Sequence, residues 1–168
     1  MKGKGAPRAD AWTQQQCNVA VEALRSRLAP LRDGRIGPEI VGIVRVEDGA
    51  LLRDAATIER SGERIEVRPH GGAKQDAMVA CRSLVREGLQ AHVAGHELVV
   101  VSAAPGQEDR IAAIVGRAVE QARVSVRNQR QLARKRPDAD AAAVQAAVDA
   151  AIADIDGICS TKLALVRR

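Results

Sequence analysis

The chain of 168 residues is long enough for one modest domain or two small ones. Hydrophobic residues make up 46% of it and charged residues 28%, which is typical of a globular protein and not of a disordered one. The single aromatic residue is Trp12. This composition excludes the RNA-binding sheets and barrels that stack several bases on aromatic side chains.

The sequence predicts a cytoplasmic protein with no membrane segment. No apolar run approaches the roughly eighteen residues of a membrane span, and the first ten residues lack the apolar core of a secretory signal. Cys17, Cys81 and Cys159 are odd in number and far apart, which favours free thiols in a reducing compartment over a disulfide framework.

The net charge of +5 is unevenly distributed along the chain. Residues 106–136 carry eight basic and three acidic side chains, a surplus equal to that of the whole chain. Residues 1–36 carry a net charge of +4, whereas 37–105 and 137–168 carry −2 each. Such a partition indicates a local surface for a polyanion, most simply the phosphates of a nucleic acid.

Three segments have apolar residues at helical spacing, and they cover residues 10–32, 107–136 and about 140–166. Asp10 is the expected N-cap of the first helix, and Pro30 is expected to kink that helix or end it early. Pro137 separates the second helix from the third, for which Asp138 or Asp140 is the expected cap.

Between the first two helices the sequence predicts a small α+β unit of four strands and one helix, with strands at 39–46, 56–60, 64–68 and 97–101 and the helix at 73–87. The middle two strands flank residues 61–63 and are expected to form a hairpin. The predicted fold class is therefore α+β. A three-helix bundle (1–35 and 106–168) carries a β-rich domain (36–105) inserted between helix 1 and helix 2. The two connections, near 33–38 and 102–107, form an expected hinge.

Four arginines follow one another along the second long helix at intervals of four, three and four, namely Arg123, Arg127, Arg130 and Arg134. At 100° per residue they span about 60° of the circumference, beside the apolar face. A guanidinium row on one rigid helix can contact successive phosphates. The alternative interpretation is a solvated basic face, which the scarcity of acidic partners makes weaker: Glu120 is the only acidic residue from 112 to 136.

No pattern in the sequence indicates catalysis, and we expect no enzyme, no cofactor and no metal. His92 and His96 have the spacing of helical metal ligands, but the residues around them predict a loop and no cysteine or carboxylate cluster accompanies them. Cys81 has apolar neighbours and is expected to be a buried apolar residue. Residues 71–74 precede a helix but lack the spacing of a phosphate-binding loop.

Two motifs resemble those of bacterial ribosome recycling factor. Residues 120–128, EQARVSVRN, followed by Arg130, resemble its conserved basic helix, and residues 32–38, RDGRIGP, resemble the R-x-G-R-x-x-P at the end of its first helix. Weaker similarities lie at Leu52-Arg53 with Ala56 and Ile58, and at 102–105, where the family has a proline-rich hinge strand. The resemblance follows the whole chain in order and implies the family's L-shaped fold.

The resemblance also implies a role in translation. In the family, the arginine row binds large-subunit ribosomal RNA between the subunits of the 70S ribosome. Arg127 and Arg130 match that motif and Arg123 accompanies them, while Arg110 matches a further arginine if a gap is allowed. The inserted domain of the family is pushed by elongation factor G, and GTP hydrolysis on that partner splits post-termination ribosomes.

The hinge of the family is implied at both connections of this chain. Arg32 and Arg35 match its basic pair, and the remaining expected hinge residues are Gly34, Pro38, Ser102 and Pro105. The implied partners are the ribosome and elongation factor G, and we expect the chain itself to be a monomer.

The chain also departs from the family. Its second and third helices are each shorter than expected by about two turns, roughly 11 Å, which would blunt the tip of the bundle. The family's P-L-R-Q-L-A stretch is replaced by LLRDAA at 51–56. A divergent, shortened paralogue therefore stays open. So do a ribosome-associated regulatory or inactivating factor that binds without splitting, and an adaptor that binds a partner protein independently of salt.

Overall fold

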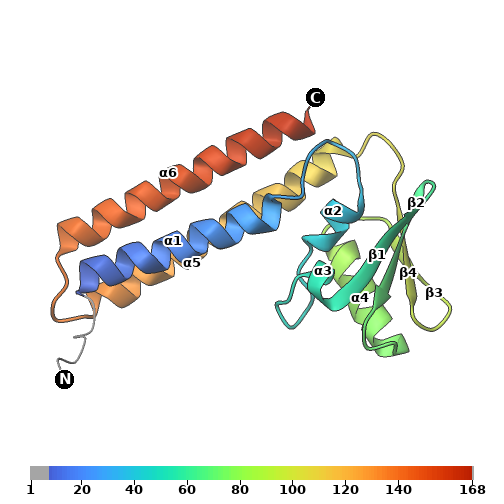
Figure 1. Ribbon diagram of the computed structural model, residues 1–168, viewed down its shortest axis with the longest axis horizontal. Helices are drawn as coiled ribbons and strands as arrows, with labels where there is room; N and C mark the ends of the chain where they lie inside the picture. Colours follow the sequence, from blue (N-terminus) through green and yellow to red (C-terminus); the bar gives the residue numbers. More distant parts are fainter. Residues whose placement is uncertain (1–7, 168) are drawn as a thin grey trace, which may run out of the picture. The chain divides into compact units, whose positions relative to one another are not determined.

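The computed structural model describes residues 8–167, which form long helices and one small antiparallel sheet (Figure 1). This confirms the predicted α+β class. The elements in chain order are α1 (Ala9–Leu28), α2 (Pro38–Gly42), α3 (Leu52–Ala55), β1 (Ala56–Ser61), β2 (Arg64–Pro69), α4 (Lys74–Arg86), β3 (Ala91–Ala94), β4 (Leu98–Ser102), α5 (Glu108–Arg134) and α6 (Ala141–Val166).

The chain divides into two compact units. Of the described residues, one unit contains 8–27 together with 116–161, and the other contains 28–115 together with 162–167. These boundaries fall inside α1, α5 and α6, so the expected domain division at 35/36 and 105/106 and the expected hinge stay predictions.

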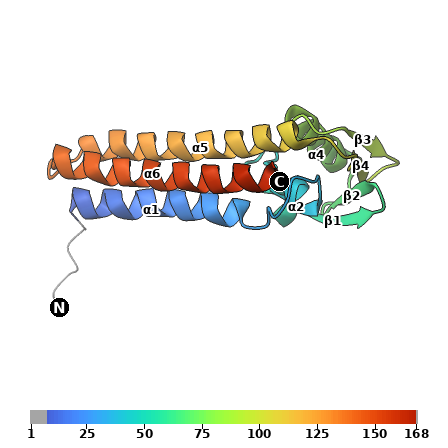
Figure 2. The same ribbon diagram turned by 90° about the horizontal axis from the view of Figure 1, so that it is seen from above.

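The first unit is a three-helix bundle in which α1, α5 and α6 run side by side (Figures 1 and 2). The predicted apolar faces are buried, including Cys17, Val21 and Leu24 of α1, Ala118, Ala122, Val126 and Ala133 of α5, and Val144, Val148 and Ile155 of α6. Arg27 is also buried, and its Nη1 donates to Oε1 of Gln121 at 2.7 Å, which links α1 to α5. As expected, α1 ends before Pro30.

The turn between α5 and α6 carries two carboxylates with different partners. Asp140 caps α6, because its Oδ1 accepts hydrogen bonds from the N–H groups of Ala142 at 2.9 Å and Ala143 at 3.3 Å. Asp138 instead accepts from the N–H of Ala9 at 2.9 Å, at the start of α1. The prediction that Asp10 caps α1 is wrong, since the helix begins one residue earlier and Asp10 lies in its first turn.

Arg136 and Trp12 complete this end of the bundle. Nε of Arg136 donates to Oδ1 of Asp138 at 3.3 Å, and its guanidinium carbon lies 5.5 Å from the centroid of the Trp12 ring, a cation–π arrangement. Burial raises the pKa of the Asp138 carboxyl, but the hydrogen bonds from Ala9 and Arg136 outweigh it, so that the pKa lies below its usual value.

The second unit contains a four-stranded antiparallel sheet in the order β1-β2-β4-β3. The predicted hairpin is confirmed: Ser61 pairs with Arg64, and Gly62 adopts a positive φ of 63° in the two-residue turn between them. One face of the sheet is apolar, with Ile65 opposite Val101 and Val67 opposite Val99, all fully buried. The inward side of α4 supplies Ala77, Ala80 and Leu84 to the same core.

Two predictions for this unit are wrong. Residues 39–46 are not a strand; they form α2 and then a single bridge between Arg45 and Leu51. Pro38 at the first helical position favours the helix start, and the apolar run after it is buried on every side, which does not require a strand. Conversely, residues 91–94 form the strand β3, where the sequence predicts a loop. The strand has only four residues and none of them is fully buried, so the sequence shows little alternation between apolar and polar residues.

Gly34 lies in the connection after α1, where the chain packs tightly against the end of α6. A Cβ added there would lie 2.2 Å from the main-chain oxygen of Val166, which cannot move without shifting the end of α6. We expect Gly34→Ala to lower the free energy of unfolding by about 2 kcal/mol or more. The matched control is Gly116→Ala in α5, where, apart from the adjacent residues and backbone of the same helix, no described atom lies within 4 Å of the added Cβ. It should raise the free energy of unfolding by up to about 1 kcal/mol. Urea unfolding followed by circular dichroism measures both, and a Gly34→Ala variant as stable as the wild type would contradict the packing.

Candidate nucleic-acid interface

The arginine row lies on one uninterrupted helix, since α5 runs for 27 residues from Glu108 to Arg134. Two arginines of the row reach side chains of α6. Arg123 donates to Asp156 and Arg130 donates to Gln145, and both acceptors belong to α6. The buried face of α5 fixes the rotation of the helix in the bundle and therefore the direction in which the arginines project.

Two of the four arginines are engaged in ion pairs. Arg123 contacts Oε2 of Glu120 at 3.5 Å and Oδ1 of Asp156 at 2.5 Å, and Arg127 contacts Oε1 of Glu120 at 2.5 Å. The hydrogen bond from Arg127 is the main reason why the pKa of the Glu120 carboxyl is lowered. Asp156 was missed at the sequence level, because it lies 33 positions from Arg123 and only the packing of α6 on α5 brings the two together.

These ion pairs weaken an interaction with phosphate without preventing it. The side chains of Arg123 and Arg127 are 34% and 49% exposed, and exposed pairs of this kind contribute only about 0–1 kcal/mol. A phosphate group offers charge-assisted hydrogen bonds of the same strength or greater. Any polyanion that binds the row has to compete with Glu120 and Asp156 for Arg123 and Arg127.

The other two arginines retain unused donors. The side chain of Arg134 is exposed and makes no hydrogen bond or ion pair with any residue from 8 to 167. Arg130 is half-buried; its Nη1 lies 3.4 Å from Oε1 of Gln145, and its Nε is buried without a partner in the described part of the chain. Arg134, next to the α5–α6 turn, is thus the arginine of the row that a phosphate can reach without displacing another side chain of the described residues.

Arg110 does not belong to this row. It lies in the first turn of α5, within the other compact unit, where its Nη1 donates to Oε1 of Gln107 at 3.1 Å. The match of Arg110 to a family arginine, which required a gap, stays a prediction.

The expected hinge residues line a second basic surface, in the unit that contains the sheet. Arg32, Gly34 and Arg35 border a cavity of about 650 Å³ together with Arg167, while Asp33 and Glu108 add negative charge to its wall. Lys162, close by, donates from Nζ to the main-chain oxygen of Leu31 at 3.1 Å. Burial, and secondarily the charge of Arg32, lowers the pKa of Lys162. Of the other expected hinge residues, Pro38 begins α2, Ser102 ends β4 and Pro105 is exposed in the connection that leads to α5.

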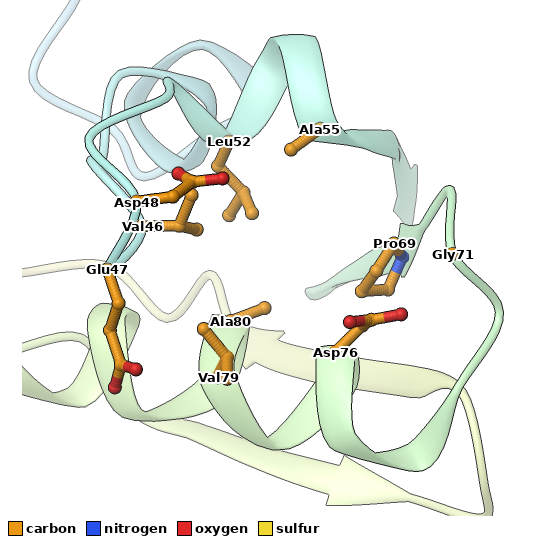
Figure 3. A pocket seen from close by; sticks show the side chains of 10 residues that line it. All are labelled: Val46, Glu47, Asp48, Leu52, Ala55, Pro69, Gly71, Asp76, Val79 and Ala80. Atoms are coloured by element: carbon orange, nitrogen blue, oxygen red, sulfur yellow. The ribbon is translucent and has the colours of Figure 1, made fainter.

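A pocket of about 310 Å³ in the same unit is bordered by acidic instead of basic side chains (Figure 3). Leu52 and Ala55 of α3 face Val79 and Ala80 of α4 across it, and three carboxylates, those of Glu47, Asp48 and Asp76, stand around it. Such a wall repels phosphate, so this pocket is no part of a polyanion site.

His92 and His96 do not lie on a helix, as a pair of helical metal ligands would. His92 lies in β3 and His96 in the turn after it, so the two are not one helical turn apart. Within residues 8–167, no group of three or more His, Cys, Asp and Glu side chains is placed to hold a metal ion. In that same part of the chain, none of the helices combines the length and apolar character needed to cross a bilayer.

Removing a competing carboxylate should strengthen the binding of a polyanion. Asp156→Asn frees Arg123 from its shortest ion pair, and we expect the Kd for heparin to fall roughly threefold, because one more guanidinium becomes available to sulfate or phosphate. Asp154→Asn is the matched control. It changes the charge of the same helix equally at an exposed side chain for which the structure shows no ion pair. Fluorescence titrations at low salt measure both, and equal affinities of the two variants would show that the Arg123–Asp156 pair does not limit binding.

The chain is similar in structure to ribosome recycling factors. One is described as the solution structure of the ribosome recycling factor; it is 19% identical, the match covers 95% of each chain, and the TM-score is 0.49. Another comes from models for the T. thermophilus ribosome recycling factor and the E. coli elongation factor G bound to the E. coli post-termination complex; it is 22% identical over 94% of this chain and 96% of that one, with a TM-score of 0.44. No protein-family model and no curated protein sequence matches the chain.

Proposed function

We propose that the chain is a ribosome-binding translation factor of the recycling type. It binds large-subunit ribosomal RNA between the subunits of the 70S ribosome in the cytoplasm. With elongation factor G and GTP it then separates the subunits of post-termination ribosomes. The chain acts as a monomer and catalyses no reaction itself, since GTP is hydrolysed on the partner.

The observation that carries this proposal is the arginine row on one side of α5. Arg134 lies eleven positions after Arg123, so the row extends about 16 Å along the helix axis, enough to contact several phosphates of one strand. Because Trp12 is the only aromatic residue in the sequence, binding rests on the backbone and shape of folded RNA and not on several stacked bases.

The two sequence motifs support the ribosome as the source of that RNA. The motif at 120–130 supplies three of the four arginines in the row. The motif at 32–38 contains Gly34, which packs against the main chain of Val166. This packing explains why a glycine stands at that position, because any side chain there would collide with the end of α6. Each motif therefore also has a physical explanation in this chain, one as the source of the basic side chains and the other as a site of close packing.

The first experiment removes two arginines of the row. We expect Arg127→Ala combined with Arg130→Ala to raise the Kd for the large ribosomal subunit roughly tenfold and to reduce the slope of log K against log salt by up to about 2, one for each lost phosphate contact. Arg60→Ala combined with Arg64→Ala is the matched control, because it removes the same charge from exposed positions of the β1–β2 hairpin. Co-sedimentation at several salt concentrations measures both. Unchanged affinity and slope in the first variant would contradict RNA binding by the row.

The second experiment separates recycling from binding alone. Light scattering of post-termination ribosomes mixed with the chain, elongation factor G and GTP should fall as the subunits separate, and a non-hydrolysable GTP analogue should abolish the change. Stable occupancy without separation would instead support a regulatory or inactivating factor of the same fold. Absence of the chain from the ribosome pellet at every salt concentration would favour an adaptor for another protein.

A further inference from the structure

Helix α4 carries apolar residues on two sides, of which the sheet covers one. Ala77, Ala80 and Leu84 lie in the core of the second unit. On the other side the side chains of Met78 and Val85 are 40% and 52% exposed, which makes them two of the most exposed large apolar residues of the described chain. Exposed apolar residues that are grouped in this way usually mark an interaction surface.

These residues line an open groove of about 440 Å³, which we call the α4 groove. Its lining residues are Met78, Cys81, Arg82, Val85, Arg86 and Val93. Five of them belong to α4 and recur at helical spacing, so the groove runs along the helix for about two turns, roughly 12 Å. The thioether of Met78 can adapt its conformation to an apolar occupant.

The charges along the α4 groove have one sign. Arg82 and Arg86 are one helical turn apart, and none of the described residues that line the groove is acidic. The side chain of Arg86 makes no hydrogen bond or ion pair with any other described residue, whereas that of Arg82 contacts Oε1 of Glu47 at 3.3 Å. The groove therefore combines an apolar floor with a positive border.

We infer that the α4 groove binds an acidic amphipathic helix of a partner protein. Such a helix places an apolar face against Met78, Cys81 and Val85, and carboxylates one turn apart pair with Arg82 and Arg86. A helix fits better than an added strand, because α4 side chains supply nearly all of the lining and β3 contributes only Val93. A nucleic acid would leave the apolar floor uncovered. This inference does not depend on the proposed function, since the row on α5 takes no part in it.

The test uses two designed peptides and one reporter. Both peptides are 18-residue helices with leucine along one face; one has glutamate beside the leucines and the other has lysine at the same positions. The chain contains only two methionines, Met1 and Met78, so labelling methionine methyl groups with carbon-13 gives one NMR signal from the groove. We expect the glutamate peptide to shift the Met78 signal saturably with a Kd of roughly 10–100 μM, and the lysine peptide to bind at least about tenfold more weakly.

Three variants test whether the peptides bind in the α4 groove. Val85→Ser should raise the Kd of the glutamate peptide about tenfold, because it removes apolar contact at an exposed position that the fold does not need. The matched control is Val19→Ser on α1, where valine is 58% exposed, and it should leave the Kd unchanged. Arg86→Glu should reverse the preference, so that the lysine peptide binds more tightly than the glutamate peptide.

Four results would overturn the inference. They are equal affinity of the two peptides, an unchanged Kd in Val85→Ser, no shift of the Met78 signal at millimolar peptide, and a shift that appears on concentrating the protein alone. The last result would assign the groove to a second copy of the chain.

Discussion

Four guanidinium groups keep a common direction because α5 is a single continuous helix whose apolar face is buried in a bundle. The burial of Ala118, Ala122 and Val126 fixes the rotation of that helix, and the arginines beside this face cannot turn away from one another. Carboxylates on α5 and α6 oppose them. In the proposed function, Glu120 and Asp156 compete with RNA phosphate for these guanidinium groups, and this competition sets the affinity of the row for RNA.

Elements with a strong periodic signal were predictable from the sequence. The three long helices, α4 and the β1–β2 hairpin appear where apolar spacing and turn residues placed them, because each buries a well-defined face. The region around Ile40 to Val44 was not predictable in this way. A run that is apolar at every position shows no period, and the preference of Pro38 for a helix start decided its local structure.

The placement of the four arginines on one helix was predictable from the sequence, but the side chains that contact them were not. Helical arithmetic placed Arg123, Arg127, Arg130 and Arg134 on one side of a helix. It could not show that Asp156 binds the first of them, or that Nε of Arg130 is buried, because both follow from the packing of α6. The apolar side of α4 that faces solvent was missed for a similar reason, since Met78 and Val85 have the same spacing as core residues.

The most direct measurement asks which molecule lies against the row on the ribosome. Gln131 is exposed and lies about 40° around α5 from Arg127, so a photo-cross-linking amino acid at this position reaches whatever the arginines contact. Irradiation on the large subunit should join position 131 to ribosomal RNA, and high salt should abolish the product. The same group at Glu22, which is exposed on α1, is the control and should give less of it. Retained ribosome binding with no RNA cross-link from position 131 would contradict a phosphate-binding row.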